Sequence, residues 1–156
     1  MDVFSLENPV FRIYVIAASL MILKMLGHAY LVVFRMIRVN GGFVNPEDTK
    51  KTLLNPNASA TQTDTNEYVE RARRMHRNEG ENTPLFLGAG LIFVAAMPSE
   101  TLAAIMLYGY VVARLAHFGA YATAQIHDVR ATFYSIGTAF LFAMVLYALY
   151  AALTFG

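Results

Sequence analysis

Three polar or ionisable side chains share one helical face inside an apolar segment. Arg114, His117 and Tyr121 stand at positions i, i+3 and i+7 of residues 101–124, a stretch long and apolar enough to cross a bilayer. An arginine at the bilayer centre costs about 2.5 to 3.5 kcal/mol even on the insertion scale, so this face needs an internal partner or a ligand. A buried structural ion pair is the alternative to a ligand site.

A second polar segment, VERARRMHRNEGEN (69–82), covers a wide arc of its predicted helix with charged and amide groups. Helical spacing places five of its side chains on one face: Glu70, Arg74, Arg77, Asn78 and Glu81. Arg73 and His76 project from a neighbouring face. The alternative for Arg71, Arg73 and Arg74 is a cluster of cations that snorkel to the lipid headgroups.

The last apolar helix opens with an i, i+4 pair, Arg130 and Tyr134, at the same end as the 69–82 segment. Five arginines are therefore expected to converge with the single acid Glu81: Arg73, Arg74, Arg77, Arg114 and Arg130. Guanidinium groups bind carboxylates through paired hydrogen bonds. The residues predict a cavity for an anionic ligand that carries carboxylates.

The composition is that of a membrane protein. The chain has 156 residues, of which 56% are hydrophobic and 15% charged, and its mean hydropathy is +0.43. We expect one integral membrane domain, residues 1–156, folded as an all-α bundle of four transmembrane helices. The predicted spans are residues 10–36, 72–97, 99–124 and 130–154.

The second span is unusual, because its apolar part from Leu85 to Met97 covers only about 20 Å at 1.5 Å per residue. Pro84 is expected to bend the helix where its polar and apolar halves meet. Residues 39–66 are rich in Gly, Pro, Asn and Thr and predict a solvated loop. Asp64 or Thr65 is expected to cap the second helix.

Lysine and arginine residues gather around the 37–70 loop, which predicts that this loop and residues 125–130 are cytosolic and both termini lie on the other side. The pattern is a topology signal and argues against a nucleic-acid partner. No cysteine is present, so any thiol chemistry must belong to a ligand. No metal is expected, since nothing is spaced to join His76 or His127 as a ligand.

Lys24 and His28 form another i, i+4 pair, deep in the first helix. A structural pair with a neighbouring helix is the favoured interpretation, with a proton relay as the alternative.

Several segments carry a family resemblance. They are FVNPED (43–48), VERARRMHRNEGEN (69–82), PLFLG (84–88), ARLAHFGAY (113–121) and an arginine at 130 that opens the last helix. In this order and spacing the chain resembles the MAPEG family of membrane enzymes over about residues 10–150. Within the family it is most similar to the microsomal glutathione transferases, to which the microsomal prostaglandin E synthases are related.

The resemblance implies a homotrimer of four-helix subunits, with glutathione as co-substrate in a site between neighbouring subunits that opens to the cytosol. By motif position it implies contacts to glutathione from Arg73, Arg74, His76, Asn78, Glu81, Arg114 and Tyr121, with Arg130 beside the thiol. Arg38 matches a further family ligand, although the spacing from it to NPED is longer here. Arg77 and His117, which lie among these residues, complete the predicted glutathione-binding set, and Tyr121 or Tyr134 is expected to assist Arg130.

The predicted function is a membrane-bound glutathione transferase that attacks lipophilic electrophiles in detoxification, with peroxidase activity on lipid hydroperoxides beside it. The alternatives are a prostaglandin E synthase-like isomerase, a non-catalytic membrane scaffold or regulator, and a small transporter lined by Arg114 and Lys24. The isomerase is disfavoured because Ala131 stands where that branch carries a serine. The expected setting is the endoplasmic reticulum or the mitochondrial outer membrane of a eukaryote, or the inner membrane of a bacterium.

Overall fold

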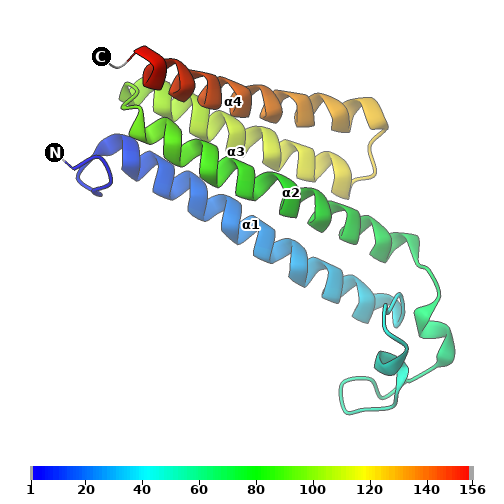
Figure 1. Cartoon of the computed structure of the whole chain (residues 1–156). Helices are drawn as coiled ribbons and strands as arrows, with labels where there is room; N and C mark the ends of the chain where they lie inside the picture. Colours follow the sequence, from blue (N-terminus) through cyan, green and yellow to red (C-terminus); the bar gives the residue numbers. More distant parts are fainter. Residues whose placement is uncertain (1, 155–156) are drawn as a thin grey trace. The chain divides into compact units, whose positions relative to one another are not determined.

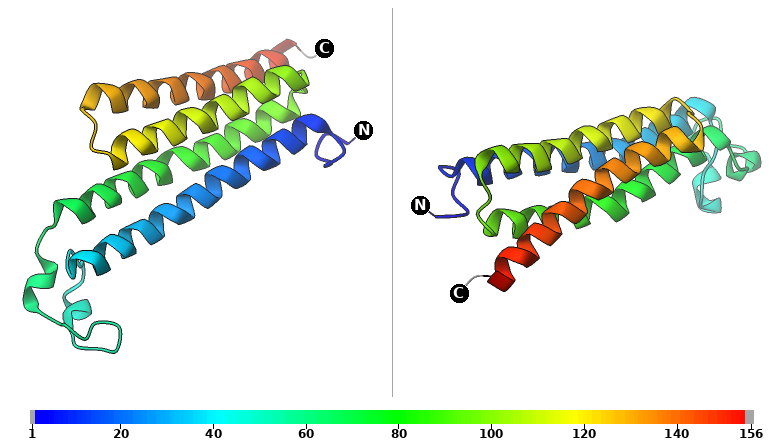
Figure 2. Two further views of the ribbon diagram at one scale, coloured as in Figure 1. Left: turned by 180° about the vertical axis from the view of Figure 1, so that it is seen from behind. Right: turned by 90° about the horizontal axis from the view of Figure 1, so that it is seen from above.

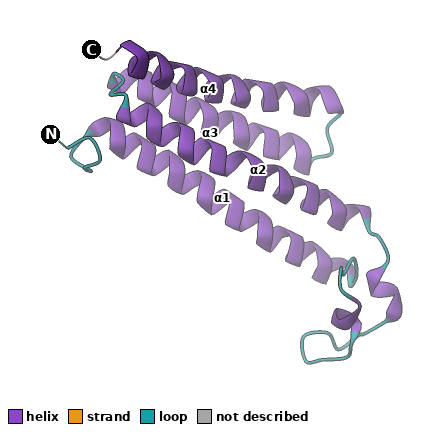
Figure 3. Ribbon diagram, viewed as in Figure 1, coloured by secondary structure: helices purple, strands orange, loops and turns teal. Residues whose placement is uncertain are grey.

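Four long helices make up most of the computed structural model, which describes residues 2–154 (Figure 1). They are α1 (Pro9–Val39), α2 (Glu67–Ala95), α3 (Glu100–Ala122) and α4 (His127–Thr154). Within the described residues every regular element is helical, as Figure 3 shows by colour. The all-α prediction is confirmed, and the largest error in a boundary is at α2, which begins at Glu67 rather than at residue 72.

Local side chains set where the helices begin. Pro9 opens α1, where its missing N–H costs nothing, and Asn8 Oδ1 accepts a hydrogen bond from the Val10 amide (3.0 Å). Ser99 caps α3 through the Leu102 amide (3.3 Å). At α2 the cap is Asn66, whose Oδ1 accepts from the Tyr68 amide (3.0 Å). The predicted caps Asp64 and Thr65 are wrong, because Asp64 already ends a short helix before α2.

Among residues 2–154, three helices are long and apolar enough to cross a membrane: α1, α3 and α4. The charged first half of α2 keeps that helix out of this group. This agrees with the short apolar part expected for the second span. The helix continues through Pro84 as one element.

The chain divides into two compact units. The larger one contains residues up to Lys24 and from Gly80 onward, and the smaller one contains Met25–Glu79. Helices α1 and α2 each contribute a segment to both units. The expectation of a single membrane domain stays a prediction.

The core of the larger unit joins segments of all four helices. Its fully buried side chains include Met21, Phe86, Leu107 and Met144. The rings of Phe86 and Tyr110 stack with their centroids 4.2 Å apart. These apolar contacts pack α3 against its neighbours. The polar face of α3, which carries Arg114 and His117, is therefore packed inside the protein as well.

Helices α3 and α4 form an antiparallel hairpin, and the two further views in Figure 2 show them side by side near their connection. Two glycines permit this close approach. A Cβ at Gly109 would lie 2.5 Å from Cζ of Phe140, and one at Gly137 would lie 3.3 Å from Cδ of Arg114. Because glycine has no side chain, Gly109 makes room for the Phe140 ring and Gly137 makes room for Arg114.

The smaller unit contains an ordered loop with two short 3₁₀ helices, η1 (Pro46–Thr49) and η2 (Ala60–Thr63). Buried Gln62 donates from Nε2 to Asn40 Oδ1 (2.8 Å) and to Asn55 Oδ1 (3.0 Å), and its Oε1 accepts from Asn55 Nδ2 (2.8 Å). Side-chain amides therefore tie the loop to the end of α1, an arrangement that the expectation of a solvated loop did not include. The loop is also shorter than predicted, because residues 37–39 and 67–70 belong to helices.

Gly109→Ala is expected to destabilise the α3–α4 hairpin by about 1 to 3 kcal/mol, because the new methyl group overlaps the Phe140 ring. Gly88→Ala is the matched control. A Cβ there meets nothing within 4 Å, and alanine is favoured over glycine in a helix by about 0.5 to 1 kcal/mol. Thermal unfolding in one detergent should give a lower midpoint for the first variant and an equal or higher one for the second. Equal midpoints for both variants would contradict the close packing at Gly109.

Candidate functional site

Five side chains of α3 and α4 gather near the connection between these helices. We call them the arginine–tyrosine cluster: Arg114, His117, Tyr121, Arg130 and Tyr134. The His117 ring lies 5.7 Å from the Tyr121 ring and 6.0 Å from the Tyr134 ring, measured between centroids. Cζ of Arg114 lies 5.8 Å from the Tyr134 ring and Cζ of Arg130 lies 4.6 Å from the Tyr121 ring. The structure thus brings together the predicted stripe of α3 and the pair that opens α4.

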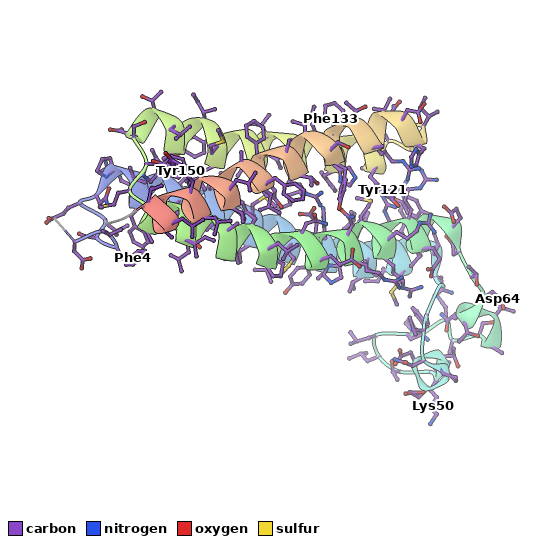
Figure 4. The ribbon with its side chains drawn as sticks, turned by 45° about the horizontal axis from the view of Figure 1, so that its top comes forward. Phe4, Lys50, Asp64, Tyr121, Phe133 and Tyr150 are labelled. Atoms are coloured by element: carbon purple, nitrogen blue, oxygen red, sulfur yellow. The ribbon has the colours of Figure 1, made fainter. Side chains whose placement is uncertain are left out.

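The cluster runs from the protein interior to an accessible edge. Arg114 is only 1% exposed and His117 is buried, whereas Tyr134 is exposed. Figure 4 labels Tyr121 at the end of α3 and Phe133 in the first half of α4, which marks this region of the hairpin. A small molecule at the accessible edge would meet the tyrosines and Arg130 before the deeper guanidinium of Arg114.

Arg130 has an unsatisfied donor. Its Nε is buried and has no hydrogen-bond partner among residues 2–154, while one face of its guanidinium covers the Tyr121 ring. Leaving such a donor unpaired costs about 1 to 3 kcal/mol, and more for a charged group. An anion bound here would supply the missing acceptor, and the Tyr121 ring beside the guanidinium stabilises its charge.

In the smaller unit the first turns of α2 hold their arginines with acids of the same helix. Arg73 donates to the Glu70 carboxylate and to the Gly42 carbonyl oxygen. Arg74 donates to Glu67 Oε1 at 2.5 Å. The guanidinium groups of Arg73 and Arg74 are therefore each held by a carboxylate of the same helix.

A groove of about 510 Å³ lies in the same unit, lined by Ala29, Val32, Arg73, His76 and Arg77. Nδ1 of His76 is buried and has no hydrogen-bond partner in the described part of the chain. One wall of the groove is cationic and the other is apolar. Three of the predicted binding residues therefore border one space that suits a small anionic ligand.

The other predicted residues are placed differently. Arg38 is exposed in the last turn of α1 and does not line this groove. Asn78 is partly buried, and Glu81 is exposed in the larger unit. No group of three potential metal ligands occurs among residues 2–154.

Sequence reasoning passed over two buried charges. Arg35 donates from Nη1 to the Tyr68 carbonyl oxygen (2.8 Å), and its Cζ lies 4.2 Å from the Tyr68 ring. Glu79 is also buried. The signal for Arg35 was available, because it lies one turn deeper in the apolar helix than Arg38 and so requires an internal partner. No comparable signal separates Glu79 from its neighbour Glu81.

Comparison with known proteins gives one consistent result. The MAPEG family profile matches residues 14–150. Microsomal glutathione S-transferase 1 of Rattus norvegicus is 34% identical over 118 residues, which cover 76% of this chain and 75% of the relative. The proteins of the same name from Homo sapiens and Bos taurus are 30% and 32% identical over 132 residues, which cover 85% of this chain and 84% of each relative.

The pairing of Glu67 with Arg74 and Arg71 predicts that the stability of the protein depends on pH. The hydrogen bond from Arg74 lowers the pKa of Glu67 from 4.5, and the charges of Arg74 and Arg71 act in the same direction. Because the folded pKa is depressed, this pairing stabilises the start of α2 above pH 4.5 and its contribution is lost as the pH falls through the folded value.

Glu67→Gln should therefore lower the unfolding midpoint at neutral pH, and the difference from the parent should vanish in acid. Thermal unfolding of both proteins between neutral pH and acid checks this. Glu47→Gln, at an exposed acid with no ion pair to a described residue, serves as control. A Glu67→Gln difference that stays constant across the series would contradict the ion pair as its source.

Proposed function

The chain belongs to the MAPEG family, and we propose that this member is a membrane-bound glutathione transferase that converts the glutathione thiol into a thiolate. Its relatives assign it to the glutathione-related membrane enzymes. The unsatisfied Nε of Arg130 beside Tyr121 carries the proposal, because it offers a charge-assisted donor to an anion. The thiolate then attacks a lipophilic electrophile that arrives from the bilayer.

The energy required of Arg130 is modest. A free cysteine thiol has a pKa of about 8.5, so half ionisation at pH 7 requires a shift of about 1.5 units, or about 2 kcal/mol. One hydrogen bond to a charged group supplies about 1.5 to 3 kcal/mol. Arg130 is thus sufficient alone, and the hydroxyl groups of Tyr121 and Tyr134 add donors near the same sulfur.

The remaining arginines and their neighbours hold the peptide. Arg73, Arg74 and Arg77 bind the two glutathione carboxylates, and Glu81 faces the ammonium group. His76, Asn78, Arg114 and His117 complete the set, with Arg38 as an additional cation. Glu70 pairs with Arg73 and Glu67 pairs with Arg74 within the chain, so glutathione binding at these arginines exchanges one carboxylate for another.

The chemical step joins sulfur to the electrophilic atom and releases the leaving group with its electron pair. On a lipid hydroperoxide the same thiolate attacks the terminal oxygen, the O–O bond breaks, and the lipid alkoxide leaves and takes up a proton to become the alcohol. A second glutathione then reduces the resulting sulfenic acid to give the disulfide and water. The relatives are named as microsomal enzymes, and we propose the endoplasmic reticulum membrane for a eukaryotic source. Conjugation assayed beside prostaglandin isomerisation separates the proposed activity from that of a synthase.

We propose that the working form is a homotrimer. The charged first half of α2 requires polar neighbours on more than one flank, and a second subunit would supply them. Native mass spectrometry in mild detergent is expected to give three times the chain mass of 17.3 kDa. A stable monomer that still binds glutathione would remove the intersubunit site.

Glu81→Gln should weaken glutathione binding while the protein stays folded, because the exposed carboxylate faces the ligand ammonium. We expect an affinity loss of about 10- to 150-fold, from a charge-assisted bond of about 1.5 to 3 kcal/mol. Glu79→Gln is the matched contrast, since that buried acid is expected to affect the unfolding midpoint first. Calorimetry with glutathione and thermal unfolding test both. Unchanged affinity in Glu81→Gln would assign this acid to a structural role.

Arg130→Leu should raise the pKa of the thiol of bound glutathione by about one to two units, because the thiolate loses its charged hydrogen-bond donor. Conjugation at pH 7 should fall by about tenfold or more and recover partly as the pH rises, since the affected species is an anion with a depressed pKa. The measurements are thiolate absorbance on adding glutathione and the pH profile of conjugation.

Arg114→Leu is the control for this experiment. If Arg114 binds a carboxylate, its loss weakens affinity with little change in the pH profile. The roles are reversed if Arg130→Leu keeps the parental thiolate signal while Arg114→Leu shifts it.

A further inference from the structure

Two leucines at the tip of the loop are almost completely exposed. Leu53 and Leu54 are each 96% exposed, whereas no other large apolar side chain among residues 2–154 exceeds 77%. Both lie outside the four long helices, so a transmembrane location does not explain their exposure. An adjacent pair of leucines held in water calls for a partner.

The exposure is built into the fold of the loop. The backbones of Thr52 and Asn55 exchange two hydrogen bonds of 3.2 Å, which close a turn with the leucines at its two central positions. Asn55 fixes the turn from inside, because its Nδ2 donates to Gln62 Oε1 (2.8 Å) and to the Asp48 carbonyl oxygen (3.1 Å). The loop therefore holds both leucines outward through buried polar contacts.

Charge is arranged asymmetrically around the turn. Lys50 and Lys51 come directly before it, both are exposed, and neither forms an ion pair with a described residue. Figure 4 shows Lys50 at the outer edge of the loop. The nearby acids Glu47 and Asp48 belong to η1, where Asp48 accepts a hydrogen bond from Asn45 Nδ2 (3.2 Å). The tip itself thus combines two cations with two large apolar side chains.

We propose that residues 50–54 form a membrane-surface anchor. Leu53 and Leu54 insert at the boundary between headgroups and acyl chains, and Lys50 and Lys51 contact anionic phospholipid headgroups. The loop begins where α1 ends, and α1 is long and apolar enough to cross a bilayer, so a lipid surface is a partner within reach of the tip. A second copy of the chain fits less well, because a stable protein interface uses about 20 to 30 residues a side.

The absence of tryptophan from the sequence permits a direct test. Leu54→Trp provides a single fluorescent reporter in the full chain, and Ala60→Trp, at an exposed position on η2, is the matched control. Both proteins are reconstituted in nanodiscs that contain anionic lipids brominated near the headgroup end of the acyl chain. Thermal unfolding establishes that both are folded, and Leu53→Trp serves as an independent second reporter.

Brominated lipids are expected to quench the tryptophan at 54 at least about twofold more than the tryptophan at 60, with a blue-shifted emission and weaker quenching by acrylamide. Lys50→Glu with Lys51→Glu in the Leu54→Trp background should reduce the lipid quenching in anionic nanodiscs and change it little in zwitterionic ones.

Two results would overturn the anchor. Equal acrylamide quenching at 54 and 60 without an effect of bromine means that the tip stays in water. Protection from acrylamide at 54 without quenching by bromine means that protein, such as a second copy of the chain, covers it.

Discussion

An arginine inside an apolar helix has to be satisfied by the protein, and the α3–α4 hairpin is arranged around this constraint. Arg114 is buried almost completely, so its guanidinium cannot reach solvent. Gly137 leaves space for its methylene groups, and Tyr134 offers a ring at 5.8 Å from Cζ. The neighbouring Gly109 lets the Phe140 ring approach α3. The close crossing of the two helices and the polar cluster near their connection therefore depend on each other.

Periodicity predicted the parts of this structure that depend on local sequence. The apolar helices and the shared face of Arg114, His117 and Tyr121 follow from spacing alone, because helical geometry fixes which side chains are neighbours. The pairing of Arg73 with Glu70, at i and i+3, is equally local, whereas the family resemblance predicts Arg73 as a contact to glutathione. Whether the arginine binds the acid of its own helix or a ligand depends on the relative free energies of the two ion pairs, and residue spacing does not give these energies.

The contacts of the loop were beyond local rules. Gln62 is bonded to Asn40, 22 positions away in sequence, and no pattern in the chain indicates that partner. Gly42 adopts a positive φ of 72°, and a Cβ there would meet Cγ2 of Val69 at 3.0 Å. Its carbonyl oxygen then accepts from Arg73, so the backbone of the loop helps to orient an arginine of α2. The loop was expected only to connect two helices, but it also helps to position Arg73, which lines the groove of the smaller unit.

Arg73 and Arg74 of α2 differ from Arg130 of α4 in how many of their donors have hydrogen-bond acceptors within the chain. This difference supports different roles for them. Arg73 and Arg74 already hold carboxylates, so a ligand carboxylate gains only the difference between two similar bonds. Arginines that already have partners therefore orient a ligand and favour anionic ligands, but they add little to the binding affinity. The buried Nε of Arg130 has no acceptor among residues 2–154, so an anion that binds there adds a hydrogen bond without displacing a carboxylate of the chain. A group in this state favours the charged form of whatever binds beside it, which is the physical requirement for lowering the pKa of a thiol.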